Sequence, residues 1–262
     1  MALFFHEMKR DIVKLIVWTA AIAGMLMISI AIYPQMTSQM TEMGDMFSEM
    51  GEFSSAFNMD KINFGEFSGY FAVECGNVLG LGGALFAALA GITALAKEEH
   101  GKTAEFLLTH PVSRFYVVMQ KFAALIAQII ILNLVVALAS LVVTLAINQK
   151  IDAALYLNIF AGYLIMQVEI VCIMLGISAF LRGNGIGIGI GVAIMFYFLN
   201  ILANLTDKAA FLRYITPFSY ADGTAIEISG GIEFKYLLPG LAYAVIGVVA
   251  ALIKYNRKDI RA

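Results

Sequence analysis

Six long runs of apolar residues constrain this chain more than any other feature of its sequence. They cover residues 15–33, 70–96, 122–147, 154–181, 186–205 and 236–253. A run of about 20 apolar residues is long enough to cross the hydrocarbon core of a bilayer as an α-helix. Charged residues make up only 14% of the chain, whereas soluble globular chains carry about 25%. The sequence therefore predicts an all-α polytopic membrane protein, with residues 1–262 forming one domain of six transmembrane helices.

Lysine and arginine gather at one set of span ends, and this sets the expected orientation. Twelve of the 17 basic residues lie at the two chain ends, in residues 97–121 and at Arg182, and five lie on the other side. Cytoplasmic loops retain an excess of basic residues. We therefore expect both termini and segment 97–121 in the cytoplasm, and segments 34–69 and 206–235 outside the cell. No basic stripe with interleaved aromatic residues indicates a nucleic-acid partner.

The N-terminal segment 1–14 separates its charged residues from its apolar ones. Leu3, Phe5, Met8 and Ile12 share one face. This pattern predicts an amphipathic helix that lies at the cytoplasmic membrane interface before the first span. The run that begins at His6 starts like a zinc-protease helix, but an arginine stands where the second histidine would be. We expect no metal site there.

The outer segment 34–69 is rich in methionine. Its methionines are Met36, Met40, Met43, Met46, Met50 and Met59. Several of them recur every three or four residues, so they share one face of a helix. This face has two interpretations: a greasy surface that rests on lipid or a partner, or a thioether site for Cu(I), which prefers soft ligands.

Glycine is frequent in the second and fifth spans. The positions are Gly76, Gly80, Gly82, Gly83 and Gly91 in the second span, and Gly183, Gly185, Gly187, Gly189 and Gly191 at the start of the fifth. Small residues let helix backbones approach closely within lipid. We therefore expect both spans to pack tightly against neighbours, with a hinge in the fifth as the alternative.

Two carboxylates fall within spans, Glu74 and Glu169. A carboxylate near the middle of a membrane is costly, so Glu169 should face the protein interior, a cavity or a partner. Gln128, Asn133 and Gln167 are its expected neutral partners. These four residues form a candidate translocation path, or Glu169 is a protonated packing residue.

Aromatic residues mark the second outer segment, 206–235. Phe211, Tyr214, Phe218 and Tyr220 are expected at the boundary between membrane and water. Cys75 and Cys172 lie within spans without ligand-like spacing, and we expect them to be reduced apolar fillers.

Segment 97–121 is the longest charged interruption between two spans, and its turn residues predict a short helix held between longer ones. Gly101 can end the preceding helix, and Thr103 can cap a new one with Glu105 in its first turn. Pro111 ends that helix, and Ser113 can cap the next. The short helix carries Phe106, Leu107 and Leu108 in a row. Three large apolar residues in a charged loop need a surface to bury against.

The same segment resembles the cytoplasmic loop between spans two and three of type-2 ABC transporter permeases. In that family the loop reads approximately E-x-x-G-T-x-E-x-L-L-x-x-P-x-S-R, followed by a lysine. The matching residues here are Glu98, Glu99, Gly101, Thr103, Glu105, Leu107, Leu108, Pro111, Ser113, Arg114 and Lys121. Lys102 departs from the pattern, because it separates the glycine from the threonine. The six spans, the amphipathic N-terminus and a T-P-F-S-Y segment extend the resemblance to nearly the whole chain.

The resemblance implies a coupling helix that contacts a separate cytoplasmic ATPase subunit. The contact residues would be Glu98, Glu99, Gly101, Thr103, Glu105, Phe106, Leu107, Leu108, Pro111 and Arg114. ATP and magnesium would be bound by that partner, and this chain would hold no cofactor and perform no catalysis. The resemblance also implies a second permease subunit, identical or related, in the plasma membrane of a bacterium. Such assemblies mostly export amphipathic compounds, lipids, drugs or peptides.

Three other functions are alternatives to this one. An ion-coupled carrier would work through Glu169, and a copper-related permease would use the methionines of the outer segment. An intramembrane metalloprotease is disfavoured, because Glu98 and Glu99 lack a following arginine and no histidine lies within a span. Residues 101–103 end like a phosphate-binding loop, but Ala96 stands where its first glycine must be.

Overall fold

The computed structural model describes residues 2–49, 51–58, 62–63, 65–100, 113–181, 183 and 185–257. Within these ranges the chain is helical and contains no β-strand. Six helices are long and apolar enough to cross a membrane. The predicted fold class, an all-α bundle of six spans, is confirmed.

The spans follow one another along the chain with short helices between them. They are α1 (Ala2–Glu49), the segment formed by α3 (Phe67–Cys75), η2 (Gly76–Gly80) and α4 (Leu81–His100), then α6 (Arg114–Ala146), α7 (Ala153–Ser178), α8 (Ile186–Leu205) and α11 (Phe234–Arg257). The short elements are α2 (Glu52–Ala56), the 3₁₀ helix η3 (Asp207–Tyr214), α9 (Phe218–Ala221) and α10 (Gly223–Ser229).

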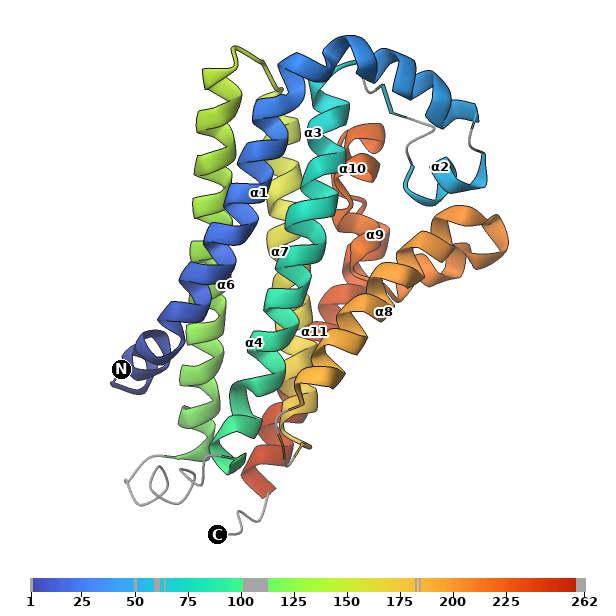
Figure 1. The fold of residues 1–262 in the computed structure, drawn as a ribbon. Coiled ribbons are helices and arrows are strands. Elements are labelled where there is room, and N and C mark those ends of the chain that lie inside the picture. The colour runs from blue at the N-terminus through green and yellow to red at the C-terminus, as the bar shows by residue number, and fades with distance from the viewer. Residues whose placement is uncertain are drawn as a thin grey trace.

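The first span belongs to a much longer helix than the sequence predicts. α1 includes the N-terminal residues and continues past Pro34, which lies inside the helix. A proline inside a helix removes one backbone hydrogen bond, and the helix can continue beyond it with a kink. In Figure 1 the first turns of α1 lie at an angle to the span, and its last turns bend over the top of the bundle. Residues 2–14 are therefore helical, and their position at a membrane interface stays a prediction.

The second and fourth spans form the centre of the bundle (Figure 1). Of the most apolar stretch of each span, 72% is buried inside the protein in the fourth span and 67% in the second. The corresponding buried share is only 28% in the fifth and sixth spans. α1 and α6 lie together on one side of this central pair, and α8 packs on α4 while α11 packs on α7. A helix that is buried all round must satisfy its polar groups within the protein, so polar side chains of these two spans need partners inside the bundle.

Glycines bring the central spans together, as predicted for the second span. A Cβ atom on Gly80 would lie 3.0 Å from the ring of Tyr163, and one on Gly91 would lie 2.7 Å from Cβ of Met174. For the fifth span the prediction holds only in part. A Cβ atom on Gly189 would lie 2.8 Å from Ile92, but one on Gly187 would meet no atom of the described residues within 4 Å. Glycines spaced two apart fall on different faces of a helix, so only some of them can meet one neighbour.

Segment 206–235, which we expect outside the cell, folds back into the bundle instead of staying at its surface. α9 and α10 lie beside α3 and α7, in the half of the molecule that is opposite the chain ends (Figure 1). Phe211 and Tyr214 are exposed, whereas Phe218 and Tyr220 are only 4% and 1% exposed. These last two residues are buried because their helix is packed against the fourth span, and the position of all four aromatic residues at a membrane boundary stays a prediction.

Candidate functional site

A π-helical turn interrupts the second span where it meets the fourth. Residues Gly76–Gly80 form this turn, η2, between two α-helical segments. π-helical turns insert one residue into an α-helix and are frequent at functional sites. Gly76 and Gly80 both face Tyr163 of α7, whose ring occupies the space that their side chains would fill. The turn thereby places Asn77, which is exposed, beside the hydroxyl group of Tyr163.

The helical hairpin α9–α10 is fixed to three neighbouring elements. Thr216 donates from Oγ1 to the carbonyl oxygen of Phe196 in α8, at 2.7 Å. The backbone N–H of Gly223 donates to the hydroxyl oxygen of Tyr163, at 2.9 Å. Gly223 also approaches the carbonyl oxygen of Ala72 so closely that a Cβ atom would lie 2.6 Å from it. The hairpin is therefore held at a fixed height against spans two, four and five.

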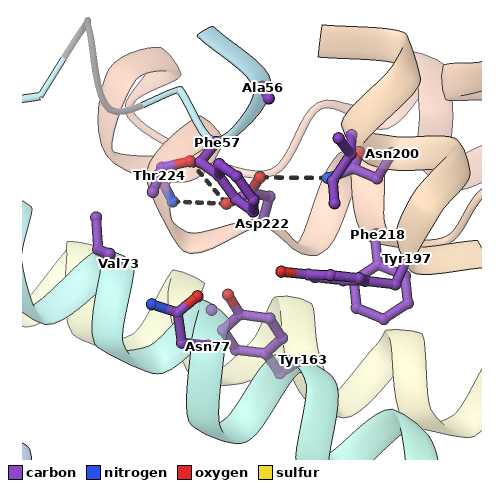
Figure 2. Close-up of a pocket in the computed structure, with 12 residues that line it drawn as sticks. Ala56, Phe57, Val73, Asn77, Tyr163, Tyr197, Asn200, Phe218, Asp222 and Thr224 are labelled. Atoms are coloured by element: carbon purple, nitrogen blue, oxygen red, sulfur yellow. Dashed lines mark hydrogen bonds between the residues drawn. The ribbon is translucent and has the colours of Figure 1, made fainter. Parts of the chain in front are cut away.

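A small cavity lies between this hairpin, the π-helical turn and α8 (Figure 2). Its volume is about 40 Å³, and we call it the outer cavity. Its lining combines aromatic and polar side chains, among them Phe57, Asn77, Tyr163, Tyr197, Asn200, Phe218, Asp222 and Thr224. Figure 2 shows the hydroxyl groups of Tyr163 and Tyr197 pointing toward the space below Asp222.

Asp222 is the charged side chain of the outer cavity, and it also caps α10. Its Oδ1 accepts hydrogen bonds from N and Oγ1 of Thr224, at 3.0 and 2.7 Å. Its Oδ2 accepts a longer bond from Nδ2 of Asn200, at 3.4 Å. Burial raises the pKa of the Asp222 carboxyl above its ordinary value, and these hydrogen bonds offset part of the shift.

Glu169, the predicted mid-depth carboxylate, faces the hairpin rather than its expected partners. Tyr220 of α9 donates to its Oε2 at 2.5 Å, and a side chain on Gly240 of α11 would overlap the carboxylate. Its other oxygen, Oε1, is buried and has no hydrogen-bond partner within the part of the chain that the structure describes. Glu169 is only 2% exposed.

Two of the expected neutral partners of Glu169, Asn133 of α6 and Gln167 of α7, pair with each other instead. Asn133 donates from Nδ2 to Oε1 of Gln167 at 2.7 Å, and the Gln167 amide fills the space beside Gly83. Gln128 is also buried, at 3% exposure. Residues 167 and 169 are two apart and therefore point in different directions on a helix. The structure thus brings Asn133 and Gln167 together and separates both from Glu169.

The end of the bundle that carries the N-terminus and the start of α6 is joined by polar contacts between helices. Nζ of Lys121 lies 2.8 Å from Oε1 of Glu7, and Arg10 contacts the other oxygen of the same carboxylate. The hydroxyl of Ser178 accepts from the backbone N–H of Leu95, at 3.0 Å. These contacts join α6 to α1, and α7 to the last turns of α4.

Arg114 begins α6, and Ser113 caps it by accepting from the backbone N–H of Tyr116, at 3.2 Å, as predicted. Nη1 of Arg114 donates to the carbonyl oxygens of Tyr255 and Asn256, both at 3.2 Å. These carbonyls belong to the last turn of α11, where a positive charge is favourable. The rest of the predicted coupling helix, from Gly101 through Thr103, Glu105, Phe106, Leu107 and Leu108 to Pro111, lies outside the described residues, as do the side chains of Glu98 and Glu99.

Metal ligands do not gather in the described part of the chain. No group of three or more His, Cys, Asp or Glu side chains there could hold an ion. Cys75 and Cys172 are buried free thiols. The side chains of most methionines in the outer segment lie outside the described residues, so the Cu(I) interpretation stays untested.

Sequence reasoning missed the residues of the outer cavity. No local sequence signal marks Tyr163, Tyr197 or Asn200. Their place in the cavity depends on contacts with residues about 20 to 60 positions away in the sequence. The run Asp222-Gly223-Thr224 does carry one, since aspartate two residues before threonine at a helix start is a capping pattern. That signal locates a helix but not its burial.

The fold and its inward-facing polar groups define a multi-pass membrane protein with polar positions held inside a helical bundle, as transport proteins have. The family model for ABC-2 family transporter proteins matches residues 1–260, so the chain belongs to this family and is an ABC transporter permease. No curated protein matches the chain.

Proposed function

We propose that this chain is half of the translocation unit of an exporter that is driven by a separate cytoplasmic ATPase. Segment 97–121 would receive that ATPase, with Phe106, Leu107 and Leu108 as apolar anchors and Glu98, Glu99 and Glu105 as polar contacts. The family membership supports a partner ATPase. A second permease subunit, identical or related, would complete the assembly, with both termini of this chain in the cytoplasm.

The observation that carries the proposal is the way in which the two helices flanking segment 97–121 are joined to the bundle. Before the segment, the last turns of α4 are bonded to Ser178 of α7. After it, Lys121 pairs with Glu7 of α1, and Arg114 bonds the end of α11. A displacement of the segment by a partner would therefore reach spans one, four and six as well as its own two helices. Packed helices move as rigid bodies in such transitions.

Glu169 is the residue that we propose for the translocation path. Its Oε1 has no hydrogen-bond partner among the described residues. A buried polar atom without a partner is costly, and a functional role would explain why the cost is tolerated. Gln128, Asn133 and Gln167 pack in the bundle, and we propose that they hold spans three and four together beside that path. Substrates would be amphipathic, as is common for the family.

The test is co-purification of the tagged chain with its ATPase, identified by mass. We expect Leu107→Asp and Glu105→Lys each to abolish the association while membrane insertion is unchanged. Lys150→Glu is the matched control, because it reverses a charge in an exposed loop that is expected on the opposite side of the membrane. Full export with Leu107→Asp and Glu105→Lys combined would refute the coupling role.

The alternative function, an ion-coupled carrier, predicts that transport depends on an ion gradient and not on ATP. Transport that survives depletion of ATP, collapses with the proton gradient and fails in Glu169→Gln would establish it in place of the ATPase-driven exporter.

A further inference from the structure

The outer cavity surrounds a carboxylate with aromatic rings. Phe57, Tyr163, Tyr197 and Phe218 contribute to its lining together with Asp222 (Figure 2). The π faces of such rings attract cations, and a desolvated site strengthens the attraction. A carboxylate within an aromatic cavity is therefore complementary to a positively charged group.

The contacts of Asp222 leave its charge uncompensated. Thr224 and Asn200 donate hydrogen bonds, but both are neutral, and no lysine or arginine of the described residues forms an ion pair with Asp222. Asp222 is half-buried, and charges that are largely removed from water are normally paired in proteins. A second cavity of about 120 Å³ also borders Asp222 and holds Arg213, which would repel a cation there and directs it to the outer cavity.

Helix capping alone does not explain an aspartate at this position. Asparagine caps helices as well as aspartate does, and it would avoid burying a charge. A neutral residue would therefore provide the same cap, and the carboxylate adds only its interaction with the dipole of the short helix α10. The negative charge is what remains to be accounted for.

The dimensions of the outer cavity restrict the cation to a small head group. A cavity needs about 10–15 Å³ to hold one water molecule, so about 40 Å³ admits an ammonium group and its first carbons. Val73 and Ile201 provide apolar lining for those carbons. The exposed Asn77 marks where the cavity reaches the surface, and an apolar chain attached to the head group can leave there.

We propose that Asp222, Tyr163 and Tyr197 form a binding site for the ammonium head group of an amphipathic amine. That such a molecule is the exported substrate rests on the proposed function, whereas its binding does not. The same chemistry is offered by a free amine and by an ammonium-bearing lipid.

The test measures binding of radiolabelled n-octylammonium to the purified full-length chain in an uncharged maltoside detergent, by scintillation proximity. We expect saturable binding that unlabelled n-octylammonium displaces and n-octanol, its neutral counterpart of equal chain length, does not. Asp222→Asn should weaken binding at least tenfold while α10 stays capped. Tyr197→Leu should weaken it several-fold, which provides a second variant if the first unfolds.

Glu227→Gln is the matched control, because Glu227 is another partly buried carboxyl of α10 but lines neither cavity. It should bind as the unaltered chain does. Equal binding by Asp222→Asn, or equal displacement by n-octanol, would overturn the proposal. Displacement by phosphatidylethanolamine would identify a lipid as the occupant, and its failure to displace would identify a free amine.

The assay contains no ATPase, so its outcome is independent of the coupling role. The two proposals can therefore fail separately. If the chain binds n-octylammonium saturably but its association with the ATPase is unchanged by Leu107→Asp, the ammonium site stands and the proposed function is rejected.

Discussion

The buried ion pair between Glu7 and Lys121 makes a quantitative prediction about how strongly α1 is held to α6. The paired atoms are 2.8 Å apart, and the side chains are 5% and 1% exposed. At that separation, with an effective dielectric constant of about 20, Coulomb's law gives roughly 6 kcal/mol of attraction. Desolvation of both groups cancels most of this attraction. We therefore expect a coupling energy of about 2 kcal/mol, within the roughly 0.5–3 kcal/mol that contacting residues show.

The perturbation is a double-mutant cycle of Glu7→Gln and Lys121→Met. The free energy of unfolding of all four proteins is measured by titrating SDS into mixed micelles. Removing one partner of a buried pair costs about 3–5 kcal/mol. The double variant should lose about 2 kcal/mol less than the sum of the single losses.

The ion pair between Asp11 and Lys14 is the internal control. It also lies in α1, but its atoms are 3.6 Å apart and the lysine is 64% exposed. Exposed pairs contribute about 0–1 kcal/mol, so its cycle should give less than about 0.5 kcal/mol. A Glu7–Lys121 coupling no larger than this control would refute the reasoning.

Three further predictions concern packing, hydrogen bonding and pH. Gly247→Ala should destabilise the protein by about 1–3 kcal/mol, because Gly247 meets the backbone of α7 directly, whereas Gly187→Ala has open space and should be neutral or stabilising. Asn133→Ala should lose about 0.6–1.7 kcal/mol with its bond to Gln167. Both are measured by SDS unfolding. The pKa of the Asp222 carboxyl is higher in the folded protein than its ordinary value of about 3.8. The folded state therefore binds this proton more readily than the unfolded state does, and the free energy of unfolding falls as the pH rises above about 3.8. The advantage of Asp222→Asn in unfolding temperature should therefore grow from pH 4 to pH 7.

Each of these predictions has a result that contradicts it. Equal effects of alanine at Gly247 and Gly187 would mean that α7 and α11 do not approach as closely as described. An Asn133→Ala variant as stable as the parent would assign no net energy to that hydrogen bond. A difference between Asp222→Asn and the parent that shrinks toward pH 7 would show that the folded protein stabilises the carboxylate rather than the acid.

The six spans could be predicted from the sequence because membrane crossing imposes a length and a composition on each segment. The cap at Ser113 could be predicted as well, since its partner Tyr116 is three residues away. Both signals are local. The motif in segment 97–121 is also local, and the matching family confirms the class of protein that it indicates.

The polar interior could not be predicted, because each of its contacts joins distant parts of the chain. Tyr220 and Glu169 are 51 positions apart, and Gly223 and Tyr163 are 60 apart. The sequence shows that Glu169 needs a partner but not which face of the fourth span it occupies. α9 and α10 are also too short for helical periodicity to reveal a buried face, and so their polar residues resemble those of an outer loop.

The hairpin α9–α10 has a consequence for how the chain is assembled during synthesis. Its polar backbone ends and Asp222 cannot be satisfied by lipid, so it cannot insert before a protein surface exists to receive it. That surface includes Tyr163 and Ala72, which are both made earlier. The sixth span is made later and packs on α7 through Gly176 and Gly247. Biogenesis is thereby ordered in time: the hairpin docks on spans that are already in place, and the sixth span packs on α7 after it.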